Sequence, residues 1–193
     1  MFNLEFVFPE IFLSLSIMFL LILGVFKKKS SKLVQNISLI VLLITAVITF
    51  NETLGIDEVL LFNESIVIDY LSSFMKIVTL LAALLVLIIS SNYLKTLKIF
   101  KIEYPILILS SVLGMMIMIS SNDLIVFYMG LELQSLALYV LATFNRDQLK
   151  SSEAGLKYFV LSALSSGLLL YGCSLIYGFS GSTNFNIIAS QLN

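Results

Sequence analysis

The chain has 193 residues, of which 59% are hydrophobic and only 12% are charged, whereas soluble domains average about 25% charged residues. Eleven basic residues against twelve acidic ones give no electrostatic basis for binding nucleic acid. The chain has no histidine and a single cysteine, Cys173, which excludes an internal disulfide and a cysteine-based metal cluster. A water-soluble fold could not bury so much apolar surface, so the composition predicts an all-α membrane helix bundle.

Six apolar segments, each near the length needed to cross a bilayer, follow one another along the chain. They are too long, and too uniformly apolar, to alternate as β-strands do. We expect them to form one polytopic transmembrane domain, residues 1–178, followed by a neutral C-terminal tail, residues 179–193. The expected spans are residues 7–26, 33–50, 70–92, 105–120, 124–144 and 154–178.

The loops between these segments alternate in charge. Nine of the eleven basic residues lie in the loops after the first, third and fifth spans. The other loops carry no basic residue and hold an acidic stretch between Glu52 and Asp69. The positive-inside rule therefore predicts both termini on the outer side, intermembrane space or periplasm, with the basic loops in the matrix or cytoplasm.

Three ionisable residues fall inside the expected spans, where each charge costs about 2.5–3.5 kcal/mol or more. Lys76 lies two turns from the outer end of its helix, so we expect it to snorkel outward or to pair with Asp69. Lys157 lies one turn into the sixth span and has Glu153 four residues before it on the same face. Its position alone is as compatible with such a local pair as with a function. The third residue, Glu132, has no such explanation.

Glu132 lies near the middle of the fifth span, as far from water as that helix allows. Tyr128, Ser135 and Tyr139 share its helical face, because they are spaced three or four residues apart in turn. Such a polar stripe should face a helix bundle or a hydrated cavity instead of lipid. We favour a carboxylate that carries protons or switches charge. The alternative is a protonated carboxylic acid held by hydrogen bonds between helices.

Four motifs in the fifth and sixth spans resemble a known family. They are NDL at residues 122–124, GLELQSL at 130–136, SEAGLKYF at 152–159 and SSGLLLYG at 165–172. Together they resemble the antiporter-like, proton-pumping subunits of respiratory complex I, NADH:ubiquinone oxidoreductase. Within that family the chain is most similar to the subunit called 2, or N in bacteria.

This resemblance implies roles for two residues. Glu132 matches the glutamate of the family's fifth helix, which belongs to the proton-translocation machinery, and Lys157 matches the lysine of the sixth-helix motif. The resemblance also implies that NADH, FMN, iron–sulfur clusters and ubiquinone bind to other subunits. The lack of cysteine ligands and of a glycine-rich nucleotide fingerprint points the same way, so we expect no cofactor on this chain.

Members of this family continue into further helices that carry intramembrane lysines, whereas this chain has six expected spans. The resemblance therefore implies an N-terminal portion, either a split-gene product completed by a second polypeptide or a truncation. The expected partners are that polypeptide, other membrane-arm subunits of complex I and membrane lipid.

The predicted function is a contribution to a proton half-channel that couples NADH oxidation and quinone reduction to proton pumping. Two alternatives remain: a subunit of a cation/proton antiporter of the same fold family, and a purely structural membrane subunit. The absence of Trp and His beside abundant Ile, Phe, Ser and Lys suggests AT-rich coding. That composition favours the mitochondrial inner membrane, with the bacterial inner membrane as the alternative.

Overall fold

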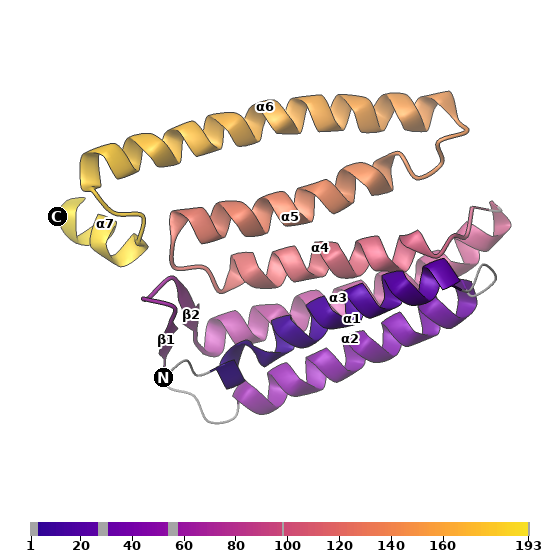
Figure 1. Ribbon diagram of the computed structural model, residues 1–193, viewed down its shortest axis with the longest axis horizontal. Coiled ribbons are helices and arrows are strands. Elements are labelled where there is room, and N and C mark those ends of the chain that lie inside the picture. The colour runs from indigo at the N-terminus through magenta and orange to yellow at the C-terminus, as the bar shows by residue number, and fades with distance from the viewer. Residues whose placement is uncertain (1–3, 27–30, 54–57, 98, 193) are drawn as a thin grey trace.

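The computed structural model describes residues 4–26, 31–53, 58–97 and 99–192, which are almost entirely helical (Figure 1). Five helices are long and apolar enough to span a membrane, and a sixth, α4, is a shorter apolar helix of 17 residues. The predicted all-α membrane bundle is therefore confirmed. The elements are η1 (Leu4–Val7), α1 (Phe8–Phe26), α2 (Ser31–Thr53), β1 (Val59–Leu61), β2 (Ile66–Ile68), α3 (Tyr70–Thr96), α4 (Glu103–Ile119), α5 (Leu124–Ala142), α6 (Leu149–Ser180) and α7 (Phe185–Leu192).

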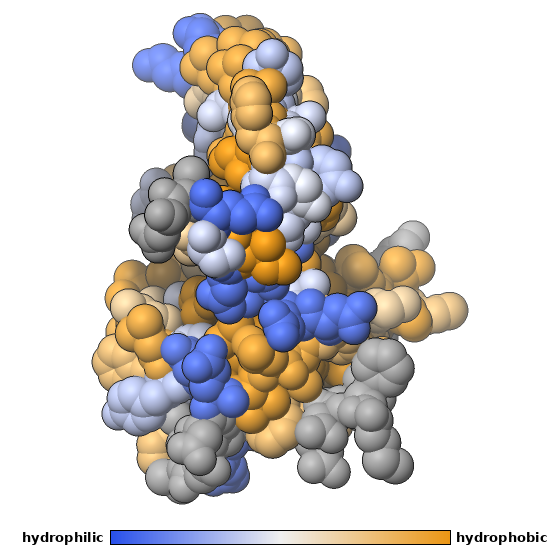
Figure 2. All heavy atoms as spheres, turned by 90° about the vertical axis from the view of Figure 1, so that its left-hand side faces the viewer, coloured by the Kyte–Doolittle hydropathy of each residue, from blue (hydrophilic) through white to orange (hydrophobic). Residues whose placement is uncertain are grey.

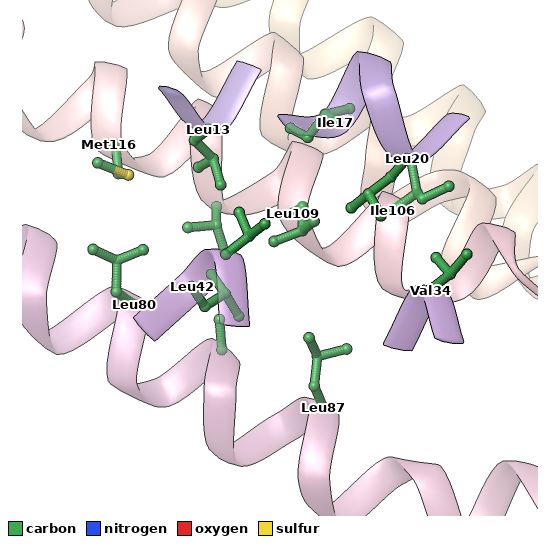
Figure 3. Close-up of a cluster of buried hydrophobic side chains, with 13 residues drawn as sticks. Leu13, Ile17, Leu20, Val34, Leu42, Leu80, Leu87, Ile106, Leu109 and Met116 are labelled. Atoms are coloured by element: carbon green, nitrogen blue, oxygen red, sulfur yellow. The ribbon is translucent and has the colours of Figure 1, made fainter. Parts of the chain in front are cut away.

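Helices α1 to α4 share one hydrophobic core (Figure 3). Each contributes a leucine with no exposed surface: Leu13, Leu42, Leu80 and Leu109. Burying one leucine side chain is worth about 1.5–3 kcal/mol in water. In a bilayer, close packing takes over much of that role, because lipid is as apolar as the side chains themselves.

Helix α5 packs on α4, and α6 packs on α5 with much less contact. Gly114 and Gly130 allow the α4 and α5 backbones to approach closely, since a Cβ on either would meet main-chain atoms of the other helix. Along α6 only Gly155 and Cys173 are buried. Most of the surface of α6 is therefore not covered by the rest of the described chain.

Two aspartates begin helices. The Asp69 carboxylate accepts the backbone N–H of Ser72, whose hydroxyl accepts the N–H of Asp69 in return, so the start of α3 is a reciprocal cap. The Asp123 carboxylate accepts the N–H of Ile125 at 2.8 Å and caps the start of α5, without a reciprocal bond. Both caps satisfy donors that the first helical turn leaves unpaired.

The tail is more ordered than the sequence predicted. Helix α6 continues to Ser180 and ends at Gly181, whose φ of +66° suits a residue without a side chain. The tail then forms α7. The prediction of a neutral tail after residue 178 missed this helix. The other span limits differ from those predicted by at most five residues, and the assignment of one domain over residues 1–178 stays a prediction.

A short β-hairpin, which the sequence analysis did not anticipate, fills the acidic stretch between α2 and α3. Strands β1 and β2 pair antiparallel, with Val59 opposite Ile68. The Glu64 carbonyl at the turn accepts the side-chain amides of Asn122 and Asn184, at 2.9 and 3.1 Å. The hairpin thus ties the α4–α5 connection to the start of α7.

The two ends of the bundle differ in charge, as predicted. We call the end that carries the hairpin, the α4–α5 connection and α7 the hairpin end (Figure 1). Figure 2 shows the molecule from this end, where hydrophilic residues gather in the middle and hydrophobic residues surround them. The opposite end is the basic end, where α1 meets α2, α3 meets α4 and α5 meets α6. Its described basic residues are Lys32, Lys95, Lys101, Arg146 and Lys150, while Lys27–Lys29 and Lys98 lie outside the described residues. Which end faces the cytoplasm stays a prediction.

Candidate functional site

Glu132 is the ninth residue of the 19-residue helix α5 and lies near its middle. Its Oε1 atom is buried and has no hydrogen-bond partner among the described residues. Leaving a buried polar oxygen unpaired costs about 1–3 kcal/mol, and more if the group is charged. Glu132 therefore needs either a proton or a polar partner that the described residues do not supply.

The three residues predicted to share the face of Glu132 have different environments. The Ser135 hydroxyl donates to the Leu131 carbonyl at 2.7 Å, within its own helix. The buried Tyr139 donates its hydroxyl hydrogen to Ser162 of α6. Tyr128 is half-buried. Of these residues, Tyr139 is the one joined to α6 by a hydrogen bond, and the supporting role of the three stays a prediction.

Tyr139 also packs against two aromatic rings of α6. The ring centroids of Tyr158 and Phe159 lie 4.9 and 5.7 Å from that of Tyr139, both edge to face. Edge-to-face pairs of this kind add about 0.5–1.5 kcal/mol to the area they bury. This cluster packs the basic half of α6 against α5.

Lys157 forms a local ion pair on α6. Its Nζ lies 2.6 Å from Glu153 Oε1, and the two side chains are 67% and 53% exposed. For Lys157 the sequence analysis left two alternatives open, a local pair with Glu153 and a functional role, and this is the local pair. The structure does not pair Lys157 with Glu132, and the predicted role of Lys157 in proton transfer stays a prediction.

The expectation for Lys76 was wrong. Lys76 is only 2% exposed, so it does not snorkel, and its Nζ lies 2.6 Å from Glu10 Oε1 of α1. The suggested partner, Asp69, instead caps α3. A contact between residues 66 positions apart is set by the packing of α1 against the bundle, which spacing along one helix cannot reveal.

The sequence analysis therefore missed a buried ion pair near the hairpin end. Glu10 is 8% exposed, and its second oxygen, Oε2, is buried without a hydrogen-bond partner among the described residues. Glu52 lies half-buried near the end of α2. The sequence did contain one indication of this pair. The first and third helices of an up-and-down bundle begin at the same end, so Glu10, early in α1, and Lys76, two turns into α3, lie at similar depths.

Metal binding has no visible basis in the described part of the chain, where no three acidic or cysteine side chains are grouped to hold an ion. What the arrangement offers is a set of carboxylates and ammonium groups at bilayer depth. Buried ionisable groups of this kind are typical of membrane proteins that move protons or ions.

Comparisons with known proteins show which membrane proteins this chain resembles. Residues 121–193 match the family model described as "NADH:quinone oxidoreductase/Mrp antiporter, TM". Over 191 residues, 99% of its length, the chain is 70% identical to NADH-quinone oxidoreductase subunit N of Pelagibacter ubique, and it is 52% identical to that of Maricaulis maris over 97%. The predicted resemblance to subunit N of the antiporter-like family is confirmed.

The chain spans about 40% of the length of these curated relatives. The relatives are bacterial, so they give no support to the predicted mitochondrial location. The bacterial inner membrane, which the sequence analysis gave as the alternative, agrees with these relatives.

Two solved structures share the fold. A chain of respiratory complex I from Thermus thermophilus superposes with a TM-score of 0.77 at 28% identity, covering 91% of this chain and 38% of that one. A chain of the Mrp complex from Dietzia sp. DQ12-45-1b superposes with a TM-score of 0.71 at 24% identity, covering 94% of this chain and 36% of that one. At that identity the second likeness concerns the fold alone.

Proposed function

We propose that this chain is part of the membrane arm of a bacterial NADH:quinone oxidoreductase and contributes a proton half-channel built around Glu132. The enzyme as a whole oxidises NADH and reduces quinone, and this chain acts as a non-redox component in the bacterial inner membrane. Its 70% identity to subunit N of Pelagibacter ubique, over 99% of its own length, supports the assignment to that complex. The flavin, the iron–sulfur clusters and the quinone site belong to other subunits in this proposal.

The observation that carries the proposal is the buried, unpartnered Oε1 of Glu132 in the middle of α5. In a medium of low dielectric constant, a carboxyl group is more stable protonated, whereas a nearby ammonium group stabilises the carboxylate. A lysine that approaches and withdraws would therefore make Glu132 release and take up a proton. This alternation is the elementary step of a half-channel.

Lys157 is the second residue of the proposed machinery. An exposed ion pair such as Lys157–Glu153 is worth only about 0–1 kcal/mol, so Lys157 can exchange Glu153 for another partner at small cost. Tyr139 and Ser162 lie between the two helices as hydroxyl groups able to accept and donate protons. They form the polar connection between the α5 stripe and α6.

The remaining part of the subunit supplies the rest of the site. Most of α6 is uncovered, and the relatives are about two and a half times as long as this chain, since it spans about 40% of them. We therefore place further helices of the same subunit, in the same or a second polypeptide, against α5 and α6. These helices would bring the lysine that works with Glu132.

A cation/proton antiporter subunit is the second candidate, favoured by the family model, whose description also names the Mrp antiporter. The two functions differ in their source of energy. If purified membranes oxidise NADH with a quinone through a complex that contains this chain, the first function is supported. Cation-dependent proton exchange without any such activity would support the second.

The test of Glu132 compares two variants in the complete complex, reconstituted into sealed vesicles. Glu132→Gln retains hydrogen bonding but cannot ionise, and we expect it to lower the ratio of protons pumped to electrons transferred. Glu132→Asp can still ionise and should retain part of the pumping. The matched control is Glu103→Gln, which removes an exposed carboxylate at the basic end of α4. A Glu132→Gln complex that pumps normally would contradict the proposal, because a neutral structural acid is well mimicked by an amide.

A further inference from the structure

A pocket of about 290 Å³ lies at the basic end of the bundle, between the start of α4 and the end of α5 (Figure 1). We call it the basic-end pocket. Lys101 and Arg146 line it, one from the segment before α4 and the other from the connection between α5 and α6. The packing of α5 on α4 brings these two cations, which are far apart in the chain, to one place. The proposed function gives this pocket no role.

Neither cation of the basic-end pocket has an acidic partner among the described residues. The ion pairs that these residues form lie elsewhere in the bundle. Glu103 lines the same pocket, but it forms no ion pair with Lys101 or with Arg146. Two cations and one carboxylate give the lining of the pocket a net charge of +1. An anionic group would therefore be attracted to this place.

Lys101 is positioned by an aromatic ring. The residue is half-buried, and its Nζ lies 6.0 Å from the centroid of the Phe144 ring, which also lines the pocket. Tyr104 packs edge to face against the same ring, with the centroids 5.6 Å apart. A ring face attracts an ammonium group without using up its N–H donors. Lys101 is therefore able to donate hydrogen bonds to a ligand in the pocket while it keeps this contact.

The connection that carries Arg146 is held by two hydroxyl groups of α6. Ser152 donates to the carbonyl oxygen of Arg146 at 3.2 Å, and Ser151 donates to that of Ala142 at 2.9 Å. The exposed guanidinium group of Arg146 therefore extends from a backbone that is tied to α6. Its planar set of N–H groups matches two oxygens of a phosphate or carboxylate at once. Of these two anions, the phosphate leaves further oxygens for Lys101.

The polarity of the basic-end pocket changes with depth. Glu103 is the first residue of α4, and Leu107 lies one turn further into that helix. On α5, Val140 precedes the helix end at Ala142, and Phe144 follows it. The charged residues thus line the pocket at the helix ends, whereas Leu107 and Val140 line it on the bilayer side. A ligand that matches both parts has an anionic head and an apolar chain, as a phospholipid does and a free phosphate ion does not.

We propose that the basic-end pocket binds an anionic phospholipid, whose phosphate is held by Lys101 and Arg146 and whose chains begin along Leu107 and Val140. Basic pockets between membrane helices suit such headgroups. A zwitterionic lipid also carries a phosphate, but its own ammonium group cancels the net charge, so the positive pocket favours the anionic lipid. The inference does not rest on the role of Glu132, because it concerns lipid binding and has its own readout.

The test uses the complete complex in phosphatidylcholine vesicles that contain a small fraction of a photoreactive lipid. That lipid is either phosphatidylglycerol or phosphatidylcholine with the same photoreactive chain, and mass spectrometry identifies the cross-linked peptides. We expect phosphatidylglycerol to label the segments around Leu107 and Val140 more strongly than phosphatidylcholine. The double variant Lys101→Gln with Arg146→Gln should lower this labelling by about fivefold or more. Labelling by phosphatidylcholine should not change.

Three comparisons complete the experiment. The matched control, Lys32→Gln with Lys150→Gln, removes two exposed basic residues of the same end that do not line the pocket, and should leave the labelling unchanged. Glu103→Gln should raise the labelling by phosphatidylglycerol, because it makes the pocket more positive. Inorganic phosphate, compared with chloride at equal ionic strength, should not displace the lipid.

The opposite results would overturn the proposal. Equal labelling by the two lipids, or an equal loss in the control pair, would mean that the pocket does not select an anionic lipid. Displacement by inorganic phosphate would mean that it takes a free anion instead. The absence of label from both segments would mean that another part of the complex covers the pocket.

Discussion

Gly114 of α4 and Gly130 of α5 lie against each other at a close approach of the two helix backbones. A Cβ atom on Gly130 would lie 2.8 Å from the backbone nitrogen of Met118 and 3.0 Å from the carbonyl oxygen of Gly114. Backbone atoms cannot rotate away as a flexible side chain can. The position of α5, and with it the depth of Glu132, therefore depends on the absence of a side chain at these two positions.

We expect Gly130→Ala to separate α4 from α5 and to destabilise the complex by about 1–3 kcal/mol, the usual cost of overpacking. Thermal melting of the detergent-solubilised complex would measure this loss. Gly172→Ala serves as the control, because no described atom lies within 4 Å of a Cβ built there. Equal melting temperatures for the two variants would contradict the close-packing interpretation.

Glu10→Gln should destabilise the bundle by about 3–5 kcal/mol, since it removes the carboxylate that lies 2.6 Å from the buried Lys76 ammonium. The exposed Glu153→Gln, which breaks the Lys157 pair, should cost no more than about 1 kcal/mol. The double variant Glu10→Gln with Lys76→Met should recover much of the loss. Urea-dependent unfolding or assembly yield would rank the three, and a double variant less stable than Glu10→Gln would count against a buried ion pair.

Asp123→Ala should loosen the start of α5. It removes a helix cap and a hydrogen bond that the Asp123 carboxylate accepts from the Thr183 hydroxyl, next to α7. Losing a cap costs about 0.5–2 kcal/mol. Hydrogen exchange should become faster at the first turn of α5 and at α7 together. The control is Asp147→Ala, at an exposed loop residue, where exchange at those two segments should not change.

The orientation of the chain can be tested by thiol labelling in sealed vesicles. In a Cys173→Ser background, we expect a cysteine at Glu64 of the hairpin end to react from the periplasmic side. A cysteine at Lys150 of the basic end should react from the cytoplasmic side, as the positive-inside rule requires. Reaction of the Lys150 position from the periplasmic side would reverse the orientation.

The helices could be predicted from the sequence because long apolar runs and alternating loop charges depend only on residues close in the chain. The Lys157–Glu153 pair was foreseeable for the same reason, since four residues make one helical turn. Glu132 was identified by its depth, by the polar residues on its face and by the family resemblance, and the structure adds that its Oε1 has no described partner.

Contacts between distant segments could not be predicted in this manner. The Glu10–Lys76 pair joins helices whose packing is decided by their whole surfaces. The hairpin consists of two three-residue strands in a stretch dominated by acidic residues, where no alternating pattern is long enough to recognise. The close approach of α4 and α5 at Gly114 and Gly130 is likewise a contact between two helices, which neither helix reveals by itself.

The unequal lengths of two helices have a consequence for the surrounding bilayer. At 1.5 Å per residue, the 17 residues of α4 span about 26 Å and the 32 residues of α6 about 48 Å, against a hydrocarbon thickness of about 30 Å. Because α4 is enclosed by α1, α3 and α5, lipid need not adapt to its shortness. Helix α6 must instead tilt, or extend its polar first turns at Lys150–Glu153 into the headgroup layer, so this edge of the protein would impose a hydrophobic mismatch on the membrane that the α1–α4 core does not.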